Sequence, residues 1–190
     1  MPNSRTRKSD KPAVRAIIQA RAARLFSSRG YGSVSVGDIM GELGRTHGAF
    51  YHYFRSKQQL LSAILRDQAA EISAIKSLRA LTENLLARAG ARGEGWVLAS
   101  VLQEVEQLPE DLTELVATQL ARHARRLDEL QAGGFGPPGL EIMMTQIGAF
   151  QIMRAAPRMA YDVSTVLTES AKPMAGERAV EDVQRMTVKR

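Results

Sequence analysis

The chain has 190 residues, a formal net charge of +6 and no cysteine, and only 5% of its residues are aromatic. This length suffices for one large hydrophobic core, or for a small domain joined to a larger one. The absence of cysteine excludes disulfides, thiolate metal sites and thiol redox switches. No apolar run reaches the length of a membrane span, and the polar N-terminus lacks the apolar core of a signal peptide. We therefore expect a cytoplasmic protein without a membrane partner.

The positive charge is concentrated in the first third of the chain. Residues 1–60 contain eleven Lys or Arg and three acidic residues, a formal charge of +8, which leaves −2 for the other 130 residues. Such a segment attracts the phosphates of a nucleic acid without regard to sequence. A basic surface that serves only solubility explains the charge equally well when the charge is considered alone.

The first eleven residues are polar, basic and aperiodic, which predicts a flexible arm at 1–11. Such an arm can enter a DNA minor groove, but a terminus without a specific partner fits the same composition. A helix is predicted from Pro12 to Gly30, because Pro is favoured in a first turn and Gly directly after a last one. Its apolar stripe, expected to be buried, consists of Val14, Ile17, Ile18, Ala22, Leu25 and Phe26.

A short helix is predicted to follow between Ser35 and Gly44. Ser35 and Asp38 have the spacing of a capping box, and Gly44 stops the helix. Its apolar residues recur at i, i+3, i+4 and i+7, which is the pattern of one buried helix face. These residues are Val36, Ile39, Met40 and Leu43.

Thr46 is positioned to cap a second short helix directly after this turn. Phe50 and Phe54 are four residues apart and so face the same core. The outer side of this helix is left with small, aromatic and hydrogen-bonding residues, which is what a helix-turn-helix presents to a DNA groove. These outward residues are His47, Gly48, Tyr51 and His52.

The stretch GRTHGAFYHYFRSK, followed by QQLLSAIL, resembles the recognition helix and the next helix of TetR-family transcriptional repressors. The resemblance covers about the first third of the chain and involves several residue types at fixed spacing. It departs from the family pattern at two positions. Arg45 replaces a residue that is usually small and apolar, and Tyr53 replaces a residue that is usually His.

The resemblance implies that Thr46 and Tyr51 contact DNA and that Lys57, at the start of the next helix, binds a phosphate. Arg45 in the turn can serve as a cationic phosphate ligand, whereas the side chain of Tyr53 cannot become cationic. Residues 46–54 contain no Asn, Gln, Arg or Lys, so the usual bidentate pairings with bases are missing and DNA shape should contribute to specificity. The expected DNA-binding residues are Arg45, Thr46, His47, Gly48, Tyr51, His52, Tyr53 and Lys57.

Helical patterns continue after Ser56 without a linker, so we predict an all-α protein with two domains. The resemblance implies that an N-terminal three-helix helix-turn-helix DNA-binding domain is followed by a C-terminal helical ligand-binding and dimerisation domain. Further helices are expected at 57–75, 78–89, 96–108, 111–130, 140–155 and 157–167, with a loop at 133–139. The predicted bounds are 1–11 for the arm, 12–56 for the DNA-binding domain, 57–171 for the second domain and 172–190 for a tail.

The resemblance also implies an effector cavity in the second domain. Its expected lining consists of large or polar residues on helices whose pattern is otherwise that of a core, and each of them is also compatible with ordinary packing. They are Trp96, Gln103, Gln119, His123, Met143 and Phe150. His47 and His52 are too few and wrongly spaced for a metal site. Because no enzymatic motif is present, we expect neither catalysis nor a cofactor.

These features predict a homodimeric transcriptional regulator, most simply a repressor. It would bind a pseudo-palindromic double-stranded operator and be released by an unidentified small-molecule effector. Two alternatives remain open. One is a non-specific architectural DNA-binding protein without an effector, and the other is a helical adaptor whose basic face meets an acidic protein or a membrane surface.

Overall fold

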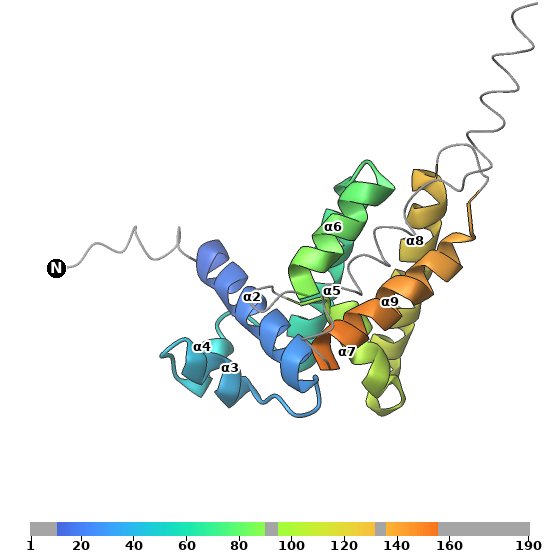
Figure 1. Cartoon of the computed structure of the whole chain (residues 1–190). Helices are drawn as coiled ribbons and strands as arrows, with labels where there is room; N and C mark the ends of the chain where they lie inside the picture. The colour runs from blue at the N-terminus through green and yellow to red at the C-terminus, as the bar shows by residue number, and fades with distance from the viewer. Residues whose placement is uncertain (1–10, 90–94, 132–135, 156–190) are drawn as a thin grey trace, which may run out of the picture. The chain divides into compact units, whose positions relative to one another are not determined.

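The computed structural model describes residues 11–89, 95–131 and 136–155, and these ranges contain helices and no strand (Figure 1). The predicted all-α class is confirmed. The arm up to residue 10, the helix expected at 157–167 and the tail at 172–190 lie outside the described residues. The elements are α2 (Lys11–Arg29), α3 (Val36–Glu42), α4 (His47–Phe50), α5 (Lys57–Ala74), α6 (Leu78–Ala89), α7 (Val97–Val101), the 3-10 helix η1 (Leu102–Gln107), α8 (Glu110–Leu130) and α9 (Gly139–Ala155).

The chain divides into two compact units. The first unit joins Met1–Glu71 to Ala87–Leu120, and the second joins Ile72–Leu86 to Ala121–Arg190. The long helices α5 and α8 each contribute to both units. A compact unit is not the same thing as an independently folding domain, so the domain bounds expected from the sequence stay a prediction.

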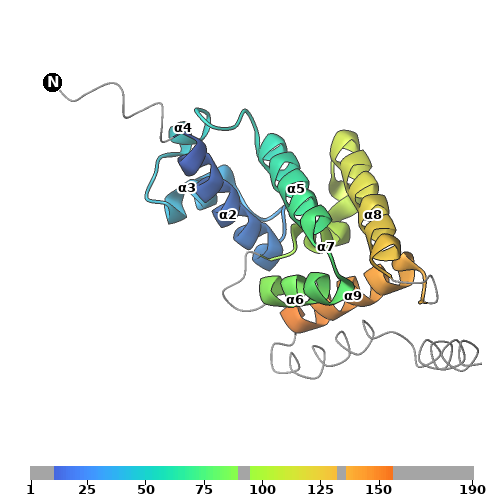
Figure 2. The same ribbon diagram turned by 90° about the horizontal axis from the view of Figure 1, so that it is seen from above.

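In the first unit, α3 packs against both α2 and α4 (Figure 1 and Figure 2). Gly30 ends α2 as predicted, with a φ of +88° and its N–H on the carbonyl of Phe26 at 3.0 Å. The buried stripe of α2 includes Ile18, but the expectation that Ile17 is buried is wrong, because this side chain is 54% exposed. One residue is a rotation of about 100° around a helix, which takes Ile17 away from the line of Ile18 and Phe26.

The segment predicted as one helix at 96–108 is two elements in the structure. All five residues of α7 are buried, whereas the 3-10 helix η1 that continues it has no buried residue. The next helix, α8, begins at Glu110, so Asp111 lies in its first turn and does not cap it. A fully buried segment thus leads directly into one that is half-buried or exposed.

In the second unit, α9 begins against α8. The Asp128 carboxylate accepts the N–H of Gly139 at 2.6 Å, and a Cβ at Gly139 would lie 2.2 Å from the carbonyl oxygen of Ala124. Only glycine permits this close approach of the two helices. One side of α9 is buried, including Met143 and Phe150, and the other side carries large apolar residues that are exposed. The exposed ones are Leu140, Met144 and Ile152.

Candidate nucleic-acid interface

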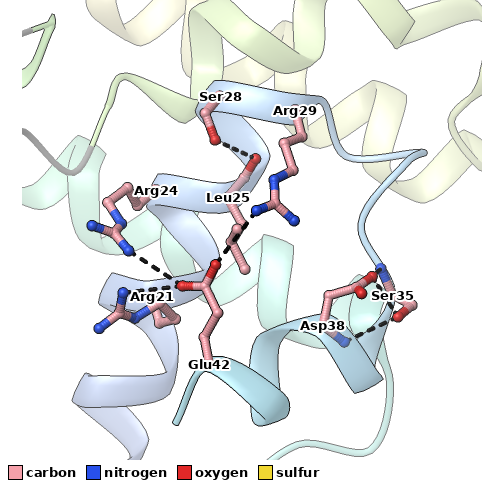
Figure 3. A network of polar contacts seen from close by, with 8 residues as sticks. All are labelled: Arg21, Arg24, Leu25, Ser28, Arg29, Ser35, Asp38 and Glu42. Carbon is pink, nitrogen blue, oxygen red and sulfur yellow. Dashed lines mark hydrogen bonds and ion pairs between the residues drawn. The ribbon is translucent and has the colours of Figure 1, made fainter. Parts of the chain in front are cut away.

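A complete capping box begins α3 (Figure 3). The Ser35 hydroxyl oxygen accepts the N–H of Asp38 at 3.1 Å, and the Asp38 carboxylate accepts the N–H of Ser35 at 2.8 Å. The Ser35 hydroxyl also donates to this carboxylate at 2.6 Å. These hydrogen bonds, first that of the Ser35 side chain and then that of its backbone, hold the pKa of Asp38 below its ordinary value. The entry into the helix-turn-helix is thereby fixed locally.

The turn and the second helix also form as the sequence predicts, but the helix is very short. Gly44 has a φ of +62° in the turn, and the Thr46 hydroxyl oxygen accepts the N–H of Ala49 at 3.3 Å. Helix α4 spans only four residues. Phe50 is completely buried beneath it and stacks on Phe54 with ring centroids 5.6 Å apart. Two buried aromatic rings therefore anchor a helix too short to be stable by itself.

The outer face of α4 and the residue after it is open. His47, Gly48, Tyr51 and His52 are all exposed, and the exposed fraction of Tyr51 is 55%. A Cβ at Gly48 would meet no atom within 4 Å, so the backbone there is accessible to a close partner. Nε2 of His47 lies 3.3 Å from the hydroxyl of Tyr51, and the Tyr51 ring packs edge-on against Phe50. This surface combines hydrogen-bonding groups with a firm base.

A contact that sequence reasoning missed holds the end of this segment. Nη1 of Arg15 donates to the carbonyl of Tyr53 at 2.5 Å, and the Arg15 guanidinium lies 3.9 Å from the centre of the Phe54 ring. A guanidinium over an aromatic face is an attractive cation–π geometry. The helical periodicity of α2 places Arg15 on the exposed side of the helix. The contact forms because the Arg15 side chain is long enough to extend to Tyr53 and Phe54.

Three arginines of α2 converge on Glu42, the last residue of α3 (Figure 3). The distances from the guanidinium nitrogens of Arg21, Arg24 and Arg29 to the Glu42 carboxylate are 3.0, 3.2 and 3.6 Å. Exposed ion pairs contribute little to stability one by one, but a shared carboxylate fixes the relative position of the two helices. One carboxylate for three guanidiniums also leaves an excess of positive charge on this face.

Lys57 is directed into the protein and not outward. Its ammonium donates to the carbonyls of Tyr31 at 3.0 Å and of Val34 at 2.9 Å, and it lies 4.2 Å above the Tyr31 ring. Desolvation lowers the pKa of Lys57, an effect that Glu104 opposes. Two of its three N–H donors are used internally, so phosphate binding by Lys57 stays a prediction that depends on the third.

Of the other expected interface residues, Arg45 is exposed in the turn, and its N–H is bonded to the Met40 carbonyl at 2.9 Å. The structure thus leaves Arg45, Thr46, His47, Gly48, Tyr51 and His52 exposed on either side of the buried Phe50. Tyr53 is half-buried, and the Lys57 ammonium is bonded to backbone carbonyls of the α2–α3 loop.

The expected effector residues are divided between the two units, which leaves a shared cavity untested. In the first unit, Trp96 and Gln119 are buried, whereas Gln103 is exposed on η1, unlike a cavity-lining residue. In the second unit, His123, Met143 and Phe150 are buried. A cleft of about 200 Å³ in the first unit contains none of these six residues. It is lined by Ala16, Gln19, Ala20, Ala23, Ile64, Asp67, Gln68 and Glu71.

Sequence reasoning missed the partner of His123. Nε2 of His123 lies 3.0 Å from Oε1 of Gln146 on α9, and each residue is only 3% exposed. Burial lowers the pKa of His123, against the opposing effect of this hydrogen bond, and so favours the neutral imidazole. The signal available in the sequence was a glutamine within the mostly apolar stretch 142–150, whose other polar side chain is Thr145.

Among the described residues, no helix is long and apolar enough to cross a membrane. The same part of the chain brings no three His, Cys, Asp or Glu side chains together in a way that suits a metal ion.

Comparison with known proteins points to one family. A family model described as "Bacterial regulatory proteins, tetR family" matches residues 18–64. The chain is 41% identical over 46 residues to the HTH-type transcriptional repressor KstR2 of Mycolicibacterium smegmatis. These residues make up 24% of this chain and 22% of KstR2. It is 30% identical over 142 residues to the transcriptional regulator AcuR of Cereibacter sphaeroides, with 64% of each chain covered. The aligned region is thus less than two thirds of either relative.

Solved structures show the same fold over most of the chain. A TetR transcriptional regulator from Legionella pneumophila matches with a TM-score of 0.69 and 14% identity, covering 90% of this chain and all of the other. AibR, solved in complex with isovaleryl coenzyme A and operator DNA, matches with a TM-score of 0.58 and 19% identity, covering 81% of this chain and 95% of AibR. At these identities the likeness concerns the fold alone.

Proposed function

Because this chain belongs to the tetR family of bacterial regulatory proteins, we propose that it binds a double-stranded operator and represses transcription from it. The observation that carries the proposal is the exposed surface of α4 and of the two residues after it, where His47, Gly48, Tyr51 and His52 are exposed and Phe50 is buried. The repressor role is supported by the name of the relative KstR2. A DNA-binding repressor of this kind acts in the cytoplasm and needs no catalytic group.

The proposed repressor is a homodimer that uses the exposed side of α9. Leu140, Met144 and Ile152 lie exposed at intervals of four or eight residues, and a Cβ at Gly148 between them would meet no atom within 4 Å. A stripe of large apolar residues with a flat centre is suited to a second helix. A two-fold dimer requires an operator with pseudo-palindromic half-sites.

The proposal includes release from DNA by a small molecule. AibR was solved with isovaleryl coenzyme A as well as with operator DNA, which supports an effector-controlled regulator of this fold. In this chain, the buried His123–Gln146 pair places two polar side chains within an apolar core. Such a pair is a candidate for effector recognition. A molecule that binds the DNA-free conformation more tightly shifts the population away from the DNA-bound one.

The proposal is tested by selecting bound fragments from genomic DNA and footprinting the protein on them in moderate salt. We expect a few fragments with two symmetrically placed protected half-sites. Equal recovery of all fragments would instead identify an architectural DNA-binding protein. Recovery of none would favour an adaptor whose basic face binds a different partner.

A further inference from the structure

The loop between α2 and α3 is held from two sides by groups of opposite charge. The Glu104 carboxylate accepts the N–H of Tyr31 through Oε1 at 2.7 Å and the N–H of Gly32 through Oε2 at 2.6 Å. The Lys57 ammonium donates to the carbonyls of Tyr31 and Val34. In this loop, the carboxylate from η1 therefore accepts peptide N–H groups, and the ammonium from α5 donates to peptide carbonyls. Both Glu104 and Lys57 are distant from the loop in sequence.

The loop sequence fits this carboxylate closely. A Cβ at Gly30 would lie 2.5 Å from Oε1 of Glu104, and a Cβ at Gly32 would lie 2.8 Å from Oε2. Gly30 also has a positive φ, which by itself favours glycine. Gly32 has no positive φ, so its missing side chain serves the close approach of Glu104 and not the backbone conformation.

The segment that carries Glu104 is fixed to the same unit at its other end. Gln68 of α5 accepts the N–H of Val97 and donates to the carbonyl of Gly95, each at 3.1 Å, and so holds the start of α7. η1 has no buried residue of its own. Two hydrogen bonds of Glu104 attach η1 to the α2–α3 loop.

We propose that Glu104 is a positioning residue for DNA binding. Its carboxylate fixes the α2–α3 loop and, through it, the orientation in which α3 and α4 leave α2. This inference rests on the proposed function. Without the Glu104 carboxylate, the N–H groups of Tyr31 and Gly32 lose their hydrogen-bond acceptor. Lys57 still donates to the carbonyls of Tyr31 and Val34. The loop then samples more conformations, and ordering it on DNA costs affinity. A merely structural contact would change stability and leave the affinity of the folded protein unaltered.

The first test compares Glu104→Ala with Glu106→Ala, since Glu106 is an exposed carboxylate on the same 3-10 helix. Fluorescence anisotropy measures the Kd for an operator fragment obtained by genomic selection, well below the unfolding temperature. We expect Glu104→Ala to weaken binding about tenfold and Glu106→Ala to stay within about twofold. Glu104→Gln keeps one acceptor oxygen and should be intermediate, which also covers the case in which the alanine variant does not fold.

The second test perturbs the same contact by a substitution in the loop. Gly32→Ala places a methyl group against the Glu104 carboxylate and should weaken operator binding in the native background. In the Glu104→Ala background, where no carboxylate is present, it should cost little more. Equal Kd values for Glu104→Ala and Glu106→Ala, or fully additive costs of Gly32→Ala and Glu104→Ala, would overturn the proposal.

Amide hydrogen exchange separates this inference from the proposed function. The Tyr31 and Gly32 amides should exchange faster in Glu104→Ala than in the native protein, with the amide of buried Leu60 unchanged. If the native protein bound no DNA fragment, the proposed function would fail, and exchange alone would decide whether Glu104 orders the loop. Unchanged exchange at Tyr31 and Gly32 would contradict that role.

Discussion

His47 at the start of α4 and Tyr51 directly after its end form an exposed pair four residues apart, with Nε2 of the imidazole and the phenol oxygen separated by 3.3 Å. Their ring centroids are 5.5 Å apart. The pair therefore presents one connected hydrogen-bonding group to a partner, instead of two independent side chains. Because residues 46–54 contain no Arg, Lys, Asn or Gln, this pair is a prominent hydrogen-bonding feature of the segment.

Replacing Tyr51 by Phe removes the hydroxyl and keeps the ring. We expect Tyr51→Phe to weaken operator binding by about three- to tenfold, as the loss of one or two hydrogen bonds predicts. The thermal unfolding midpoint should hardly change, because the hydroxyl is exposed. Competition binding with operator and scrambled DNA measures the effect, and an equal loss on both DNAs would assign Tyr51 to the phosphates instead of the bases.

Arg45 in the turn is expected to bind a phosphate. Arg45→Ala should weaken binding to all DNA sequences alike and reduce the slope of log K against log salt by about one. Arg79→Ala is a matched control, because Arg79 is an exposed arginine of α6 that is paired with Glu83. A change that affects the operator alone would show that Arg45 contacts bases.

Asp38 should stabilise the protein in a pH-dependent manner. Its pKa in the folded protein lies below the ordinary 3.8 because Ser35 donates hydrogen bonds to the carboxylate. The stabilisation is therefore present above that ordinary value and is lost as the pH falls through the folded pKa. Urea unfolding of the native protein and Asp38→Asn should differ near neutral pH and converge in acid. A constant difference at all pH values would exclude the carboxylate as its cause.

Buried His123 should make the protein less stable in mild acid. Its folded pKa lies below 6.5, so as the pH falls below that value the unfolded chain gains a proton that the folded protein does not. Stability is thus complete above 6.5 and declines as the pH falls toward the folded pKa. His123→Gln should flatten this part of the unfolding profile. An unchanged profile would show that another group titrates there.

A charge within the exposed α9 stripe should disrupt the dimer. Met144 is 64% exposed, and Met144→Lys places an ammonium where the proposed interface has an apolar contact. Sedimentation should show mainly monomer at micromolar concentration. Ile17→Lys, a change at a comparably exposed residue of α2, should leave the dimer intact. A dimer that survives Met144→Lys would place the interface elsewhere.

The helix-turn-helix could be predicted in detail because its signals are local. The Ser35–Asp38 capping box, the Gly44 turn and the Thr46 cap each depend on residues within four positions of one another, and all three form as expected. The same holds for Gly30 at the end of α2. Local propensity and capping suffice to predict where these features lie in the sequence.

Contacts over long sequence separations could not be predicted. The orientation of Lys57 toward the α2–α3 loop and the binding of that loop by Glu104 depend on how α5 and η1 pack, which no local pattern contains. The helical period likewise assigned Arg15 to solvent, whereas its side chain reaches back over Phe54. Long flexible side chains choose their partners only after the tertiary structure has formed.

The central claim is that the exposed face of α4 recognises a specific operator. The most direct test is the ratio of the Kd for scrambled DNA to the Kd for the selected operator, measured at physiological salt for the native protein and for Tyr51→Ala. We predict a ratio of about a thousand or more for the native protein, with a clear loss in the variant. A ratio near one for the native protein, or a ratio unchanged by Tyr51→Ala, would contradict the claim.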